Sequence, residues 1–231
     1  MPVSRSLSFA FIHVRKTAGT SMSRALESID PQLYLNEKGL WDVLCVHPDR
    51  RHLLEKIRAF YLVGSVNNFP QWHLPAVIVR DLVGRREWHG LFSFAFVRNP
   101  WDLVVSAYHF ERRYLAQTHV NRVEPDRAEA IRRCATFEQF VRLYPLLEPL
   151  DMTSMIVDEN DRNIVSFVGR FESLSTDFAE ICRQIGASGV GLPHENRSED
   201  RRDYRSYYSA QTRQIVARYF SRDIDRFEYE Y

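Results

Sequence analysis

The stretch FAFIHVRKTAGTSM, Phe9–Met22, decides the fold of this chain. Its first residues are short, apolar and aromatic, which predicts a buried strand over 8–14. Apolar residues then recur at the spacing of a helix, at Met22, Ala25, Leu26 and Ile29. We therefore expect the small-residue segment between the two elements to be a turn that joins a strand to a helix.

This turn has the composition of an anion-binding site. A helix N-terminus presents free backbone N–H groups and a positive partial charge. Lys16 adds a full positive charge, Gly19 is expected to permit backbone angles that other residues resist, and hydroxyl donors follow at Thr17, Thr20 and Ser21. A phosphate or sulfate would suit such a turn, although the lysine precedes the glycine, unlike the Walker order GxxxxGK[ST]. A polar turn that only caps its helix stays open as an alternative.

A second junction of the same kind is FSFAFVRNPWDLVVSAY. It predicts a buried strand over 91–97, with Arg98 at its end, and a helix over 99–116 that Asn99 caps. The planar guanidinium of Arg98 suits an anion, and Ser106 adds a hydroxyl off the apolar stripe of the helix. Ligands of open parallel sheets lie at the carboxyl ends of the strands, so one ligand with two anionic groups would satisfy both junctions.

Strands and helices alternate along the rest of the chain. We expect a third strand within 163–171 and helices over 49–60, 75–84 and 209–220. The capping pair Thr136 and Gln139 marks the start of a further helix. Another helix is indicated by the apolar spacing of Leu174, Phe178, Ile181 and Ile185. The alternation predicts an α/β fold of three layers, with a central parallel sheet and helices on both faces. We expect a single domain over 1–231, in which the polar, Arg-rich stretch 186–208 is a surface loop and a candidate cofactor lid.

Composition excludes several classes of protein. The net charge of +1 gives no pull toward nucleic acid, and no apolar run has the length of a membrane span. Three cysteines, odd in number and widely spaced, with no evident signal segment, favour a cytoplasmic protein. The eight histidines show no metal-ligand spacing, so no metal site is expected.

One histidine is a candidate general base. His73 stands just before the predicted helix over 75–84, with His47, His52 and His89 as other candidates and His47 as the reserve. From the residues alone, a packed histidine at a helix entry is the favoured interpretation of His73. We expect His13, which belongs to the first strand, to lie in the core.

Two motifs resemble those of the carbohydrate-type sulfotransferases, which use 3′-phosphoadenosine 5′-phosphosulfate (PAPS). FIHVRKTAGTS resembles the 5′-phosphosulfate loop of that family, and FAFVRNPWDLVVSAY resembles its 3′-phosphate motif. FVGRFESLSTDF at 167–178 and the C-terminal DIDRFEYEY extend the resemblance over nearly the whole chain. One residue departs from the pattern: the family usually has proline where Arg15 stands, which loosens the turn and adds a charge.

The resemblance implies a fold of the nucleotide-kinase (P-loop) type and a role for each motif. The first loop would hold the 5′-phosphosulfate through Arg15, Lys16, Thr17, Ala18, Gly19, Thr20 and Ser21. Lys16 would stabilise the leaving phosphate, His73 would occupy the position of the catalytic base, and the 3′-phosphate would bind Arg98 and Ser106. No metal is implied. The acceptor would be a hydroxyl of a glycan, a glycolipid or another small hydroxylated molecule, while the oligomeric state is not predicted.

Two other functions stay open at this point. A nucleotide phosphotransferase would share the fold, although the Walker order and an acidic magnesium ligand at a strand end are both absent from the sequence. A non-catalytic homologue that binds PAP would be consistent with Arg15 in place of proline.

Overall fold

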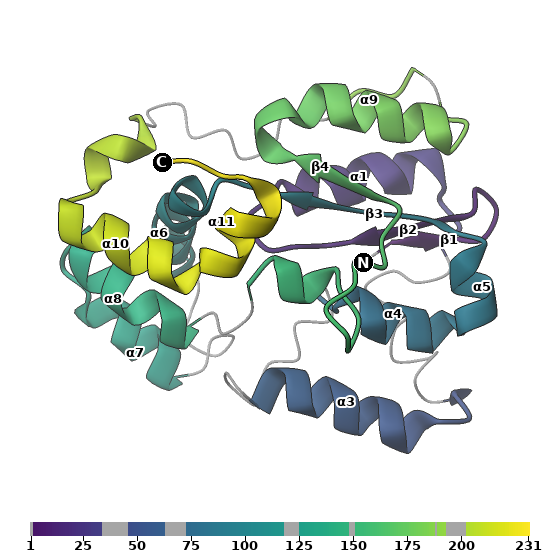
Figure 1. Ribbon diagram of the computed structural model, residues 1–231, viewed down its shortest axis with the longest axis horizontal. Helices are drawn as coiled ribbons and strands as arrows, with labels where there is room; N and C mark the ends of the chain where they lie inside the picture. Colours follow the sequence, from purple (N-terminus) through teal and green to yellow (C-terminus); the bar gives the residue numbers. More distant parts are fainter. Residues whose placement is uncertain are drawn as a thin grey trace. The chain divides into compact units, whose positions relative to one another are not determined.

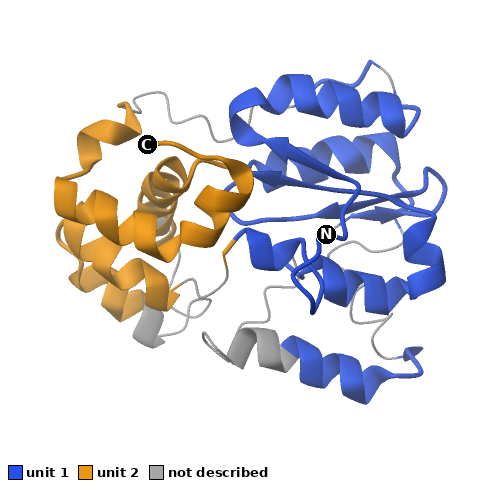
Figure 2. Ribbon diagram, viewed as in Figure 1, with its two compact units in different colours: residues 1–60, 70–97, 152–197 blue, residues 61–69, 98–151, 198–231 orange. Residues whose placement is uncertain are grey.

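The structure is a computed structural model that describes residues 2–33, 46–62, 73–117, 125–147, 151–187, 189–192 and 202–231. The chain divides into two compact units (Figure 2). Unit 1 comprises residues 1–60, 70–97 and 152–197, and unit 2 comprises residues 61–69, 98–151 and 198–231. The single domain expected over 1–231 stays a prediction, and the middle of the candidate lid, residues 193–201, lies outside the described residues.

Unit 1 is built on a four-stranded sheet with the order β1-β2-β3-β4. Three strands are parallel neighbours: β2 (Phe9–Ile12), β3 (Phe92–Val97) and β4 (Phe167–Arg170). The two-residue β1 (Val3–Ser4) pairs with β2 in the antiparallel direction, so the sheet is mixed. The α/β class is thus confirmed, with an antiparallel edge strand that is too short to be recognised in the sequence.

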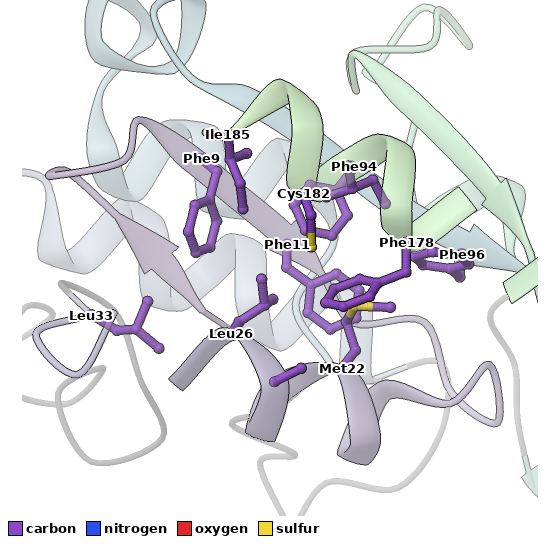
Figure 3. Close-up of a cluster of buried hydrophobic side chains, with 12 residues drawn as sticks. Phe9, Phe11, Met22, Leu26, Leu33, Phe94, Phe96, Phe178, Cys182 and Ile185 are labelled. Carbon is purple, nitrogen blue, oxygen red and sulfur yellow. The ribbon is translucent and has the colours of Figure 1, made fainter. Parts of the chain in front are cut away.

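Helices cover both faces of this sheet (Figure 1). One face carries α1 (Gly19–Ile29) and α9 (Leu174–Gln184), and the other carries α4 (Ala76–Val83) and α5 (Arg85–His89), with α3 (Arg50–Leu62) beyond them. The apolar side chains of the first face form one buried cluster (Figure 3). Its members come from β2, β3, α1 and α9 and include Phe9, Phe11, Phe94, Phe96, Met22, Leu26, Phe178 and Ile181.

Unit 2 is helical. Its helices are α6 (Pro100–Gln117), α7 (Pro125–Arg133), α8 (Phe137–Leu147), α10 (Ala210–Tyr219) and α11 (Ser221–Phe227). The predicted caps form, because the Asn99 side-chain oxygen accepts from the N–H of Trp101 at 3.1 Å, and the hydroxyl of Thr136 accepts from the N–H of Gln139 at 3.3 Å. Local capping signals therefore locate these helix starts correctly.

Other boundaries differ from those expected. The strand within 163–171 is shorter, since β4 begins only at Phe167. The short helices α5, α7 and α11 were not predicted, so the helix over 209–220 is not the last. Within the stretch expected to be a surface loop, Tyr204–Tyr207 form a 3₁₀ turn. Two other 3₁₀ turns in the described residues are Thr153–Met155 and Phe171–Ser173. In the described part of the chain, no helix combines the length and apolarity needed to cross a membrane.

A glycine in β4 allows the sheet to pack closely. Gly169 pairs with Phe96 in the parallel register, and Phe96 is fully buried. A Cβ added at Gly169 would lie 2.6 Å from Cε1 of the Phe96 ring. That separation is shorter than van der Waals contact, so any larger residue at this position would displace a core aromatic.

We expect Gly169→Ala to lower the free energy of unfolding by about 1–3 kcal/mol, because overpacking a core forces side chains and backbone to shift. Urea denaturation would measure the change. Gly191→Ala is the matched control, since a Cβ there meets no atom within 4 Å and its effect should stay close to zero. Equal stability of the two variants would contradict the packing argument.

Candidate functional site

The turn after β2 has an unusual backbone. Lys16 has a φ of 62° and Ala18 a φ of 67°, both in the left-handed region that L-residues other than glycine rarely adopt. Each such residue costs about 1–2 kcal/mol. Thr17 between them is fully buried, and its Oγ1 donates a hydrogen bond to the carbonyl of Val14 at 2.9 Å. The Thr17 hydroxyl was expected to donate a hydrogen bond to an anion, but it donates to a carbonyl inside the turn.

Helix α1 begins directly after this strained backbone. Ala18 occupies the N-cap position and makes no side-chain cap hydrogen bond, and the first turn of α1 carries no acidic residue. The first backbone N–H groups of a helix lack intrahelical partners, so they stay available to an anion. Thr20 is exposed and Ser21 is buried. The local geometry therefore has the features expected of an anion-binding turn.

Gly19 is required for a reason that differs from the one expected. Its φ is not in the left-handed region, so the expectation that it permits unusual backbone angles is wrong. Instead, a Cβ at Gly19 would overlap the imidazole ring of His13. Only glycine leaves room for that ring beside the first residue of α1.

His13 and His73 form a pair. Their ring centroids lie 4.2 Å apart, and Nδ1 of His73 lies 2.9 Å from the carbonyl oxygen of His13. A carbonyl only accepts hydrogen bonds, so Nδ1 of His73 must carry the proton. In the neutral ring, Nε2 is then the unprotonated nitrogen, which is the atom that can accept a proton.

Both imidazoles are held in the neutral form. Burial, followed by the positive charges of the N-terminal amino group, Arg15 and Lys16, lowers the pKa of His13 to about 3. Burial first, and then His13 and Arg15, also bring the pKa of His73 well below 6.5. The His73 residue nevertheless stays partly exposed. Both histidines are therefore neutral although the groups around them are positively charged.

The other candidate histidines lie elsewhere in unit 1. Nδ1 of His47 accepts a hydrogen bond from the N–H of Asp49 at 3.1 Å, just before α3. His52 and His89 are exposed on α3 and α5. Among the four candidates, only His73 contacts His13, which lies between β2 and the turn. The partner His13 was expected in the core: it is buried, but its contact with His73 was missed, because 60 residues separate the two in sequence.

The start of α6 positions the second group of predicted residues. Arg98 directly follows β3, and its side chain is only 3% exposed. Its Nε and Nη2 lie 2.8 and 2.7 Å from the Oδ2 of Asp102. Ser106 lies four residues beyond Asp102, one helical turn further along α6, and is half-buried. Residues four apart share one face of a helix, so Asp102 and Ser106 lie on the same side of α6, and Arg98 contacts the first of them. Asp102, an acidic residue in the first turn of α6, orients the Arg98 guanidinium.

In the described residues, no group of three or more histidine, cysteine, aspartate or glutamate side chains is arranged to hold a metal ion. The chemistry of the turn is that of an anion site, since its charged residues are Arg15 and Lys16.

The left-handed turn makes a prediction about stability. Ala18→Gly should raise the free energy of unfolding by about 1 kcal/mol, because glycine adopts a φ of 67° without the steric cost that alanine bears. Ala25→Gly, inside α1, should lower it by about 1 kcal/mol or more, because glycine is unfavourable in a helix interior. Chemical denaturation of both variants would test the opposite signs, and a loss of stability in Ala18→Gly would contradict the geometry.

Comparisons with known proteins bear on the fold and on the family of this chain. An uncharacterized protein of Archaeoglobus fulgidus is 30% identical over 122 residues, which make up 53% of this chain and 86% of that protein. The crystal structure of mouse sulfotransferase SULT7A1 complexed with PAP has a similar fold, with a TM-score of 0.50 and 12% identity over 96% of this chain and 86% of that one. The model of the Sulfotransferase family matches residues 1–230. The chain therefore belongs to the sulfotransferase family.

Proposed function

We propose that this protein transfers the sulfuryl group of PAPS to a hydroxyl of a glycan or another hydroxylated acceptor and releases PAP. Membership of the sulfotransferase family supports sulfuryl transfer. The solved sulfotransferase of similar fold was crystallised with PAP, which supports the same nucleotide here. The observation that carries the proposal is the state of His73, a neutral imidazole whose Nδ1 proton is donated to the His13 carbonyl, in the unit that also holds the lysine-bearing turn.

In this proposal His73 is the general base. A sugar hydroxyl is a weak nucleophile, so removing its proton during attack accelerates the reaction, typically by about 10²–10⁴-fold. The hydrogen bond from Nδ1 to the His13 carbonyl sets the tautomer, and the low pKa keeps Nε2 unprotonated at neutral pH. The same pKa makes His73 a weak base in the free protein. The negative charge of the bound donor would offset the positive field around the ring and make it more basic.

The turn would hold the 5′ end of the donor. The N–H groups from Thr17 to Ser21 would bind the phosphosulfate, and Lys16 would stabilise the charge that develops on the bridging oxygen. The acceptor oxygen forms a bond to sulfur as the bond from sulfur to the bridging oxygen breaks, and that oxygen leaves with PAP. The acceptor proton passes to Nε2 of His73 and later to water. As in phosphoryl transfer, positioning and charge stabilisation do most of the catalytic work.

Arg98 and Ser106 would bind the 3′-phosphate. β2 and β3 are adjacent and parallel, so the chain leaves both strands at the same edge of the sheet, where ligands of such sheets bind. The turn follows β2 and Arg98 follows β3. Asp102 occupies one side of the guanidinium, and its fixed orientation would direct the remaining N–H groups toward the phosphate.

A non-catalytic PAP-binding protein is the second candidate, and Arg15 in place of the family's proline is the observation that favours it. The two functions differ in one measurement. A catalyst forms sulfated product from PAPS and a panel of glycans, whereas a binding protein takes up PAP and forms none.

The 3′-phosphate assignment predicts how ligand affinities change. Wild-type protein should bind PAP much more tightly than ADP, which lacks the 3′-phosphate. Arg98→Ala should weaken PAP binding about ten- to hundredfold, because a charge-assisted hydrogen bond contributes about 1.5–3 kcal/mol. Binding of adenosine 5′-phosphosulfate, which also lacks that phosphate, should change far less. Isothermal titration calorimetry would measure all three ligands.

Arg113→Ala is the matched control for that variant, because it removes the same charge from an exposed position of α6. It should leave PAP affinity within about twofold of wild type, as expected for a screened surface charge. A wild type that binds PAP and ADP equally, or an Arg98→Ala loss shared by all ligands, would favour a kinase-type nucleotide site instead.

The role of His73 predicts a pH profile. A general base must be unprotonated, so turnover is lost as pH falls through its pKa. Because the pKa of His73 in the free protein lies well below 6.5, kcat/KM for PAPS, which reports the free protein, should stay nearly constant from pH 7.5 to about 6 and decline only in more acidic buffer. His73→Ala should lower turnover by about 10²–10⁴-fold and leave PAP affinity unchanged. His47→Ala serves as the control and should behave as wild type. Normal turnover in His73→Ala would remove this residue from the mechanism.

A further inference from the structure

The imidazole of His13 stands between the two parts of the candidate site. One side of the ring contacts His73, with the centroids 4.2 Å apart and the planes inclined by 56°. The Nε2 end meets Gly19, the first residue of α1, so closely that no side chain would fit there. Phe11 stacks on the ring at 5.7 Å with the planes inclined by 20°. The ring is thus held between Phe11 of β2, Gly19 of α1 and His73, which lies shortly before α4.

Neither hydrogen bonding nor charge of the ring accounts for an imidazole at this position. Nδ1 of His13 is buried and has no hydrogen-bond partner in the described part of the chain. An unsatisfied buried polar atom costs about 1–3 kcal/mol, and an apolar side chain would avoid that cost. The pKa of about 3 also excludes a charged ring at neutral pH. What remains specific to His13 is its size and shape, since a small flat ring reaches both Gly19 and His73.

We infer that His13 is a positioning residue for the transfer reaction, a spacer that sets the place and orientation of the His73 ring relative to the first turn of α1. The inference rests on the proposed function, in which His73 is the base and the turn binds the donor. A general base must lie about 2.6–3.2 Å from the proton that it removes, and a misplacement of 1 Å can cost about 10²-fold in rate. A rigid contact from the anion-binding turn to the base would meet that requirement.

The inference explains two features together. Gly19 is needed because the spacer occupies the volume where a side chain would be. The His13 main chain holds His73 as well, since its carbonyl accepts the Nδ1 proton. One residue therefore sets both the tautomer of the base, through its carbonyl, and the position of the base, through its ring.

The test reads His73 directly and needs no acceptor. Histidine labelled with ¹⁵N allows NMR to report the tautomer and the pKa of each ring, with the His73 signals assigned by their loss in His73→Ala. In wild type we expect the Nδ1–H tautomer and no protonation until well below pH 6.5. His13→Ala keeps the carbonyl of residue 13 but removes the ring that holds His73 against it, so the displaced ring of His73 should populate both tautomers. Its pKa should move toward 6.5, because water enters the vacated space and the contact with His13 is lost, while the charges of Arg15 and the N-terminal amino group remain.

A double-mutant cycle separates positioning from packing. Gly19→Ala should lower the melting temperature and disturb His73, because the new Cβ displaces the His13 ring. Adding His13→Ala makes room for that Cβ, so the double variant should recover the melting temperature of His13→Ala alone. Its His73 tautomer and pKa should stay altered. Gly191→Ala, a glycine in open surroundings, is the control that should change neither readout.

The outcomes are distinct. An unchanged His73 tautomer and pKa in folded His13→Ala would overturn the inference and assign His13 to packing. His13→Val, a buried apolar side chain too short to contact both Gly19 and His73, replaces His13→Ala if the latter does not fold, and an unchanged His73 there has the same meaning. Calorimetry of PAP with wild type tests the proposed function separately, because absence of PAP binding would refute that function whatever the NMR signals of His73 show.

Discussion

The close approach of the His13 ring to the first residue of α1 is the contact on which the candidate site depends. It requires glycine at position 19, and it brings His13 against His73, which arrives from a distant part of the sequence. The turn that makes the approach holds Lys16 and Ala18 in left-handed conformations. Backbone strain of this kind persists only where the surroundings over-determine it, and it gathers at functional sites. The buried hydrogen bond from Thr17 to Val14 is one of those surroundings.

Electrostatics explains why two histidines lie in this place. Their charged neighbours are cationic, namely Arg15, Lys16 and the N-terminal amino group, and burial adds to the cost of a further positive charge. Both rings therefore stay neutral, and the region keeps a positive field that suits an anionic ligand. Arg15 contributes to that field from a position where the resemblance led us to expect proline. An arginine at this position thus adds positive charge that attracts an anion to the turn.

The sheet supplies the rigid base for these groups. Phenylalanines on β2 and β3 pack against α1 and α9 in one cluster, and Gly169 lets β4 approach Phe96 closely (Figure 3). Parallel pairing of β2 with β3 makes the chain leave both strands at one edge. Arg98 then follows β3, and its ion pair with Asp102 fixes the guanidinium at the start of α6. Strand ends and helix starts, which are stiff elements, therefore carry the proposed binding residues.

The sequence by itself determined the features that depend on neighbouring residues. Strand-to-helix junctions at residues 9–22 and 92–108, and helix starts at Asn99 and Thr136, follow from apolar spacing and capping chemistry, which act over a few residues. The two motifs at these junctions were also enough to indicate the family. Short elements such as β1 and α11 left no signal of their own, because tertiary packing stabilises them.

Only the tertiary structure decided how the site is built. The hydrogen bond between His13 and His73 joins residues 60 positions apart, and no local pattern reports a contact of that range. The close approach of the His13 ring explains why residue 19 is glycine, which the sequence alone had led us to attribute to backbone freedom. The protonation states follow as well, since a pKa depends on burial and on charges that the fold assembles from β2, the turn and the entry to α4.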